Sequence, residues 1–318
     1  MTRLVFNKIS QFAGTMPERV GRLFFASFGL SSGRLWINER RRLAETIDRI
    51  YFRLDKQPPD EIQKIIDNLF IHFSLALYEI LRFNLLTEKY LKDNVIFHGL
   101  SNLQNALDKG KGVLLAVPHI GNWELLGAAI AFRNFPLHTF YLAQKENDIG
   151  TMIDEFRQYS RLVFHDRDRG MIGALKALKQ GAILGMIPDQ DGGNHGVYMD
   201  FLGHWVSMPA GPANWSLKSG AEVIPLYSVR RGRTSKFDAY FFPALPAETS
   251  SIYEERVISR ISKLASWMED VILKNPSQYL WFYDRFKPRH IDYHSSLRKS
   301  GILMHHGNTF YKNPRNAN

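Results

Sequence analysis

The chain of 318 residues contains no cysteine, which excludes disulfide bonds, cysteine nucleophiles and thiolate metal sites. Long apolar runs are missing too. A transmembrane helix needs ~18 uncharged apolar residues in a row, and no stretch of the chain reaches that length. No transmembrane helix is therefore expected. The N-terminus also lacks the apolar core and small-residue cleavage site of a signal peptide. With 45% hydrophobic and 23% charged residues, the chain is long enough for one large α/β domain or two small ones.

Acidic residues are scarce relative to basic ones, and the net charge is +10. Residues 1–56 and residues 285–318 each carry a net charge of +6, so the middle of the chain is slightly acidic. Basic ends favour an anionic partner, which is membrane lipid, an acidic carrier protein or nucleic acid. An ordinary solvated surface explains the same charge equally well.

An apolar stripe at helical spacing lies within residues 17–30, with Arg19 and Arg22 beside it. The stripe consists of Val20, Leu23, Phe24 and Phe28. A helix of this kind either lies in a bilayer interface with its arginines toward the head groups, or packs its stripe on the protein's own core. Helical periodicity continues beyond it, so residues 1–90 are predicted to form a helical, membrane-associating extension.

Short apolar strands alternate with helical patterns from residue 91 to residue 291. Strands are expected over 94–98, 112–118, 137–142, 161–164, 182–187, 223–229 and 237–242, and helices over 101–108, 147–159, 171–179, 210–219 and 253–273. The alternation predicts an α/β fold with a mixed, mainly parallel sheet covered by helices. The polar, aperiodic residues 292–318 are expected to be disordered.

The hexapeptide at 119–124, His-Ile-Gly-Asn-Trp-Glu, follows one of these strands. Gly121 and Asn122 suit the turn from strand to helix and are candidate substrate-binding residues, because the helix N-terminal amides that follow can hold an oxyanion or a phosphate. Across that turn Glu124 can accept the Nδ1–H of His119, which leaves Nε2 free to take a proton. No nearby Ser or Thr has to be the nucleophile, so the pair predicts direct deprotonation of a substrate hydroxyl. The alternative is a structural histidine at a strand end.

Two further clusters are candidate substrate-binding sites. Asp189 and Asp191 follow the strand over 182–187, where α/β proteins often bind ligands. Two aspartates raise the question of a metal ion, but hydrogen bonds that anchor the loop fit the segment better, and no metal is expected. Arg167 and Arg169 precede the helix over 171–179 and suit an anionic group, unless they pair with Asp166 or Asp168.

Aromatic and basic side chains interleave over residues 279–289. This pattern has three interpretations: aromatic rings that stack on nucleic-acid bases, an anchor at a membrane interface, or a core strand with a basic end.

Four blocks in this order resemble the bacterial lipid A biosynthesis acyltransferases, within the wider glycerophosphate and lysophospholipid acyltransferase superfamily. The first block consists of the arginine-rich helix near 40–53 and the helix that contains His72, Phe73 and Glu79. The others are His-x4-Glu at 119–124, Asp-Gln-Asp at 189–191 with Phe201-Leu-Gly after it, and Trp281-x3-Arg-Phe-Lys. The resemblance covers roughly residues 17–289. One departure is that many members carry a hydrophobic N-terminal anchor, whereas this chain has only the charged amphipathic stretch at 17–30.

The resemblance implies transfer of a fatty acyl chain from an acyl carrier protein or CoA thioester to a hydroxyl of a lipid A precursor or related glycolipid. His119 is then the general base, Glu124 its orienting partner, and Asp189 a shaper of the acceptor site, with Arg167 or Arg169 at the site as well. No cofactor is implied. The implied partners are acyl carrier protein, the glycolipid and the cytoplasmic face of the inner membrane, with peripheral or shallow attachment, no nucleic acid and a monomeric chain.

Two other functions are compatible with the same residues. An esterase or thioesterase would use water in place of the acceptor hydroxyl, although the Gly-x-Ser-x-Gly elbow of many such enzymes is missing. The second function is that of a basic protein that binds membranes or nucleic acid and has no enzymatic activity. The intact pair of His119 and Glu124 argues against this function.

Overall fold

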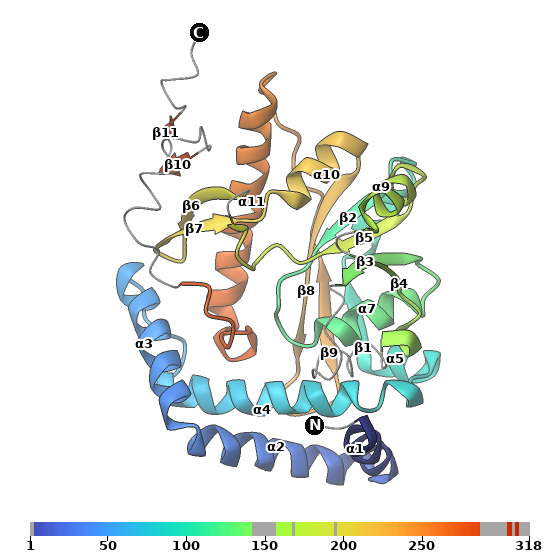
Figure 1. Cartoon of the computed structure of the whole chain (residues 1–318), viewed down its shortest axis with the longest axis vertical. Coiled ribbons are helices and arrows are strands. Elements are labelled where there is room, and N and C mark those ends of the chain that lie inside the picture. Colours follow the sequence, from blue (N-terminus) through green and yellow to red (C-terminus); the bar gives the residue numbers. More distant parts are fainter. Residues whose placement is uncertain are drawn as a thin grey trace.

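The computed structural model of the protein describes residues 3–141, 157–166, 169–193, 196–286, 304–306 and 309–311. A seven-stranded sheet lies at its centre, with the strand order β1-β9-β8-β2-β5-β3-β4 (Figure 1). Its strands are β1 (Val95–His98), β2 (Val113–Ala116), β3 (Leu137–Tyr141), β4 (Val163–Asp166), β5 (Ile183–Met186), β8 (Glu222–Arg230) and β9 (Phe237–Phe241). Neighbouring strands run parallel except β8 and β9, so the predicted mixed, mainly parallel sheet is confirmed.

Helices cover both faces of this sheet because side chains alternate along each strand. On β2, Val113 and Leu115 face the core that contains α6 (Leu100–Leu107) and α7 (Trp123–Ala131). Leu114 and Ala116 face the opposite core, which contains α10 (Gly211–Ser219) and α11 (Tyr253–Lys274). A smaller cluster attaches α9 (Met171–Lys179) beside α10. The helices predicted over 171–179, 210–219 and 253–273 are therefore confirmed, whereas residues 147–156 of the helix predicted over 147–159 lie outside the described residues.

The N-terminal helices wrap around one end of the sheet (Figure 1). They are α1 (Arg3–Thr15), α2 (Glu18–Leu35), α3 (Ile37–Arg53) and α4 (Ile62–Ile80), and α5 (Glu88–Asn94) leads into β1. The predicted helical extension is thus present in the structure. None of the helices in the described part of the chain is long and apolar enough to span a membrane.

Glycines decide which face of α2 is buried. Gly21, Gly29 and Gly33 pack against α4, and a Cβ added to Gly29 would lie 2.6 Å from the carbonyl oxygen of Phe70. Such close packing leaves no room for a side chain at these three positions, so this face of α2 must lie against α4. The apolar stripe of α2, which consists of Val20, Leu23, Phe24 and Phe28, therefore points outward, and each of these residues is 51% to 70% exposed. The interpretation that the stripe packs on the protein's own core is wrong.

A second, four-stranded sheet has the order β11-β10-β6-β7. Its hairpin of β6 (Val197–Phe201) and β7 (His204–Met208) packs against α11 and was not predicted. The turn carries only half of the usual sequence signal. Gly203 has a φ of 70° and suits the turn, but Leu202 before it takes a φ of 53°, a left-handed conformation that leucine rarely adopts. Within the predicted tail over 292–318 the structure describes β10 (Met304–His306) and β11 (Thr309–Tyr311). Disorder of the rest stays a prediction.

Candidate active site

The ends of two neighbouring parallel strands bring His119 and Asp189 together. Ala116 at the end of β2 is opposite Met186 at the end of β5, and each functional residue lies three positions further along its chain, directly after a proline. The equal offset places both side chains at the carboxyl edge of the sheet. His119 Nδ1 lies 2.8 Å from Asp189 Oδ1, and the backbone N–H of His119 donates to Asp189 Oδ2 at 2.9 Å.

This contact determines which nitrogen of His119 can act as a base. Burial of Asp189 opposes its ionisation, but the charge of His119, two hydrogen bonds from it, and Arg285 outweigh burial and lower the pKa of Asp189. An ionised carboxylate can only accept a hydrogen bond. His119 Nδ1 therefore carries the proton that Asp189 accepts, which leaves the lone pair on Nε2.

The predicted hydrogen bond between His119 and Glu124 is wrong. Asn122 is the N-cap of α7, so Glu124 falls in the first helical turn and its carboxylate points to Arg157. Arg157 Nη2 donates to Glu124 Oε1 at 2.6 Å. Glu124 nevertheless lines the same cavity as His119.

That cavity has a volume of about 240 Å³ and a mostly apolar wall. Helix α4 supplies one side of it, and the turn at 119–124 supplies the other. A second cavity of about 80 Å³ adjoins it between α7, β3 and β5. The two cavities share Trp123, Glu124, Arg157 and Ile187, so the Glu124–Arg157 ion pair lies where they meet.

The turn itself is fixed from several sides. Gly121 has a φ of 68°, and a Cβ on it would lie 2.2 Å from the carbonyl oxygen of Ser228, so only glycine fits there. Its N–H donates to the carbonyl of Gln278 at 2.9 Å. Asn122 accepts from the N–H of Leu125 at 3.0 Å and donates to Glu79 at 2.7 Å. Gly121 and Asn122 line the cavity, and their hydrogen bonds to the protein set its shape.

The other predicted site residues lie elsewhere. Asp191 accepts a hydrogen bond from the N–H of Gly193 at 2.9 Å. This bond anchors the loop, as the sequence analysis predicts for the segment. Arg169 is exposed, and its backbone N–H donates to Asp166 at 2.8 Å. Neither residue lines either of the two cavities beside the turn, and Arg167 lies outside the described residues. Within the described ranges no cluster of three or more His, Asp or Glu side chains is placed to hold a metal ion.

Two arginines near the site have roles that the sequence analysis does not predict, although Arg285 belongs to the fourth block of the resemblance. Arg157 precedes η2 (Gln158–Ser160), in a segment with no motif to mark it. Arg285 is buried and donates to the backbone carbonyl of Asp189, so it supports that residue from behind. Tyr279 and Trp281 are buried as well, so these two aromatic rings belong to the core, whereas Tyr283 is 41% exposed. Lys287 and Arg289 lie outside the described residues, and the choice among the other interpretations of this stretch stays open.

A partly buried imidazole lies in the cavity wall opposite the turn at 119–124. His72 of α4 lines the larger cavity, and no hydrogen-bond partner of its Nδ1 is found among the described residues. Burial, together with the positive charges of Arg230, Arg233 and Arg22, lowers the pKa of His72 to about 3. His72 is therefore neutral at physiological pH.

The sequence that folds into this site matches a known family over most of the chain. The family model described as "Bacterial lipid A biosynthesis acyltransferase" matches residues 6–288. The chain belongs to this family. The protein is thus an acyltransferase, and the resemblance inferred from the four sequence blocks is confirmed.

Individual relatives of this acyltransferase are distant. A lipid A biosynthesis acyltransferase of Haemophilus influenzae is 22% identical over 228 residues, which are 71% of this chain and 70% of the relative. A phosphatidylinositol mannoside acyltransferase of Mycolicibacterium smegmatis is 28% identical over 223 residues, or 67% of this chain and 69% of the relative. A lipid A biosynthesis palmitoleoyltransferase of Escherichia coli is 27% identical over 198 residues, or 60% of this chain and 61% of the relative.

Proposed function

We propose that this acyltransferase moves a fatty acyl chain from a thioester to a hydroxyl of a lipid A precursor or related glycolipid, with His119 as the general base. The observation that carries the proposal is the hydrogen bond between His119 Nδ1 and the buried, ionised Asp189 at the wall of an apolar cavity. A base held in this way removes a proton from a hydroxyl as that hydroxyl attacks.

The reaction balances with this chain's residues alone. His119 Nε2 takes the proton of the acceptor hydroxyl while the hydroxyl oxygen forms a bond to the thioester carbon. The resulting oxyanion is stabilised by Arg157 and by the backbone N–H groups at the start of α7, which point toward the turn. Collapse of the tetrahedral intermediate breaks the carbon–sulfur bond, and the leaving thiolate takes the proton from His119. No cofactor is required, because the thioester supplies the activated acyl group.

The two cavities suit the two parts of the donor. The smaller cavity is lined mainly by apolar side chains of α7, β3 and the end of β5, and its volume of about 80 Å³ suits part of the hydrocarbon tail. The larger cavity holds His119 and fits the reacting carbonyl. The basic ends of the chain suit an anionic carrier, and acyl carrier protein presents a larger acidic surface to both ends than CoA does.

Purified protein with acyl carrier protein thioesters and CoA thioesters, from decanoyl to palmitoyl, tests this function. We expect acyl transfer to a lipid A precursor, with faster turnover on the carrier protein. Release of free fatty acid at the same rate with and without the glycolipid would instead identify a thioesterase.

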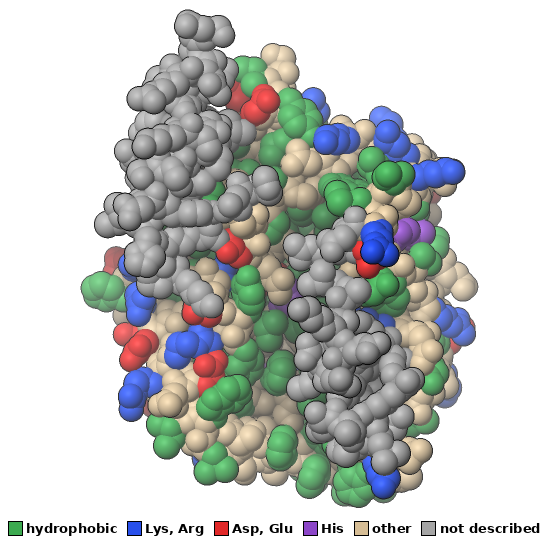
Figure 2. All heavy atoms as spheres, in the orientation of Figure 1, with side chains coloured by type: hydrophobic (Ala, Val, Ile, Leu, Met, Phe, Trp, Pro, Cys, Tyr) green, Lys and Arg blue, Asp and Glu red, His purple; other side chains and the backbone are tan. Residues whose placement is uncertain are grey.

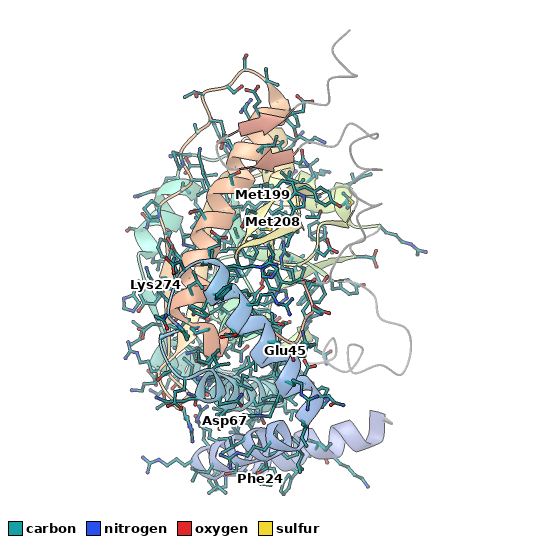
Figure 3. All side chains as sticks on the ribbon, turned by 90° about the vertical axis from the view of Figure 1, so that its left-hand side faces the viewer. Phe24, Glu45, Asp67, Met199, Met208 and Lys274 are labelled. Carbon is teal, nitrogen blue, oxygen red and sulfur yellow. The ribbon has the colours of Figure 1, made fainter. Side chains whose placement is uncertain are left out.

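We further propose that the acyltransferase attaches peripherally to the cytoplasmic face of the inner membrane through the apolar stripe of α2. Figure 2 shows hydrophobic side chains along the lower edge of the molecule, where Figure 1 places α2. Figure 3 shows Phe24 on the outer side of that helix. The stripe is exposed because glycines occupy the buried face, and Arg19 beside it is exposed as well. Arg22 does not face head groups as expected, since it is buried against Glu79.

Leu23→Glu and Phe24→Glu are each expected to weaken binding to vesicles of anionic phospholipid roughly tenfold or more. Each change removes apolar burial of about 1.5–3 kcal/mol and adds a negative charge. Co-sedimentation measures the binding. Ile172→Glu is the matched control, because Ile172 is 84% exposed on α9, away from α2. Equal losses for all three variants would contradict attachment through α2.

Glu124 and Arg157 are expected to act as one unit. Glu124→Gln and Arg157→Gln should each lower kcat roughly tenfold or more, because the ion pair places the guanidinium at the junction of the cavities. The double variant should be little slower than the slower single variant, since contacting residues do not act additively. Fully additive losses in kcat would show that the two residues serve the reaction separately.

A further inference from the structure

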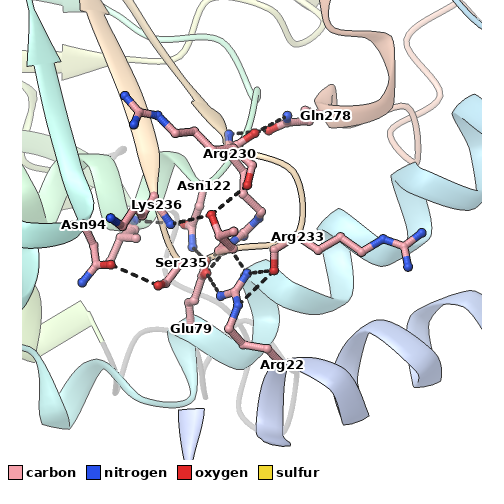
Figure 4. A network of polar contacts seen from close by, with 12 residues as sticks. Arg22, Glu79, Asn94, Asn122, Arg230, Arg233, Ser235, Lys236 and Gln278 are labelled. Carbon is pink, nitrogen blue, oxygen red and sulfur yellow. Dashed lines mark hydrogen bonds and ion pairs between the residues drawn. The ribbon is translucent and has the colours of Figure 1, made fainter. Parts of the chain in front are cut away.

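A buried ionic network lies behind the catalytic turn and joins α4, α2 and β8 (Figure 4). Its centre is Glu79 of α4, which is 5% exposed. The carboxylate accepts hydrogen bonds from Arg22 Nη1 at 3.0 Å, from Arg230 Nη2 at 2.8 Å and from Asn122 Nδ2 at 2.7 Å. Burial opposes ionisation of Glu79, but Arg230, Arg22 and the bond from Asn122 outweigh it, so its pKa is lowered.

Asn122 connects this network to the residues that react. Its Nδ2 donates to Glu79, and its Oδ1 caps α7 by accepting the N–H of Leu125. Both ends of the side chain are thus held, three positions after His119. Asp189 fixes the start of the turn through His119, and Glu79 fixes its end through Asn122.

A second route leads from the same network to the same turn. The guanidinium of Arg230 pairs with Glu79, and the backbone of Arg230 holds Gln278 by two hydrogen bonds. The N–H of Arg230 donates to Gln278 Oε1 at 2.8 Å, and the carbonyl of Arg230 accepts from Gln278 Nε2 at 3.1 Å. Gln278 in turn accepts the N–H of Gly121 through its own backbone carbonyl at 2.9 Å. Both routes therefore converge on residues 121 and 122.

We propose that Glu79 is a positioning residue for acyl transfer, which holds the turn at 119–124 in its reactive geometry through Asn122. The inference rests on the proposed function of His119. A stabilising role alone does not explain the arrangement, because a buried ion pair adds little stability compared with apolar side chains of the same size. The need to hold the reacting groups of the turn precisely does explain the network, since a displacement of about 1 Å at a reacting group can lower the rate ~10²-fold.

Two substitutions separate positioning from stability. Glu79→Asp keeps the negative charge between Arg22 and Arg230 but withdraws the carboxylate from Asn122 by one methylene. Asn122→Ser keeps an N-cap oxygen for α7 but cannot reach Glu79. The matched control is Glu248→Asp. The side chain of Glu248 is 2% exposed and pairs with Arg260, as Glu79 pairs with Arg230. Glu248 lines neither of the two cavities beside the turn at 119–124.

The measurement is kcat and KM for acyl transfer, with the thermal midpoint of each variant. We expect Glu79→Asp and Asn122→Ser each to lower kcat at least tenfold with little change in KM, and the double variant to lose less than the product of the two. Glu248→Asp should keep kcat within about twofold of wild type even if its midpoint falls by the same amount.

Two outcomes distinguish the inference from the function on which it rests. If Glu79→Asp lowers only the thermal midpoint and retains full kcat while His119→Ala is inactive, Glu79 is structural and the positioning role is wrong. If His119→Ala retains wild-type kcat in the same assay, the proposed function fails first.

Discussion

Replacing His119 by alanine is expected to lower kcat for acyl transfer by about 10²–10⁴-fold, the contribution of a positioned general base. The imidazole lies between Asp189 and the larger cavity, and within the described residues no other base is bonded to a buried carboxylate at that wall. KM for the thioester should change little, because the apolar walls that bind the chain remain. Single-turnover kinetics on purified protein measures the loss.

His204→Ala is the control for this substitution. His204 is also buried, and its Nδ1 contacts the backbone carbonyl of Leu202 at 2.9 Å. It lines neither of the two cavities beside the turn at 119–124. We expect His204→Ala to lose stability without a comparable loss of kcat. If His119→Ala transfers acyl groups at the wild-type rate, His119 is not the base.

Asp189→Asn is expected to lower kcat by a comparable factor, about 10²–10⁴-fold. Its amide can donate to His119 Nδ1, which moves the proton of the imidazole to Nε2 and removes the lone pair that accepts the substrate proton. The backbone N–H of His119 keeps an acceptor in the variant, so the turn should stay in place. Kinetics combined with the imidazole nitrogen shifts in NMR separates this tautomer change from unfolding.

The same substitution has a signature in stability. The pKa of Asp189 is lower in the folded protein than in the unfolded chain, where it is about 3.9. The unfolded chain therefore binds more protons in acid, and the stabilisation by this carboxylate is present above pH ~4 and lost as the pH falls through its folded pKa. Urea unfolding should show wild type more stable than Asp189→Asn at neutral pH, with a difference that shrinks in acid. A difference independent of pH would contradict an ionised Asp189.

Much of the fold follows from local sequence patterns, and the errors have local physical causes. The alternation of strands and helices predicted the sheet because buried parallel strands leave apolar runs between helices. The stripe of α2 was visible as a pattern, but its orientation depended on Gly21, Gly29 and Gly33, which the apolar periodicity ignores. The hairpin of β6 and β7 was missed because Leu202 occupies a turn position that normally holds Asn or Gly.

The partner of His119 depends on strand order, which no single segment reveals. The sequence does repeat one pattern: an apolar strand, then Pro118 and His119, and an apolar strand, then Pro188 and Asp189. Had β2 and β5 been recognised as neighbours, the equal offset would have paired these residues. Glu124 is the carboxylate nearest to His119 in the sequence after the turn, but the cap at Asn122 directs its side chain toward Arg157.

Lipid mass spectrometry of cells tests the central claim most directly. The gene is deleted in its own host and then restored as wild type or as His119→Ala. We predict that deletion yields a glycolipid lacking one acyl chain, and that only the wild-type gene restores it. An unchanged set of lipids after deletion, or restoration by His119→Ala, would contradict acyl transfer to a glycolipid by His119.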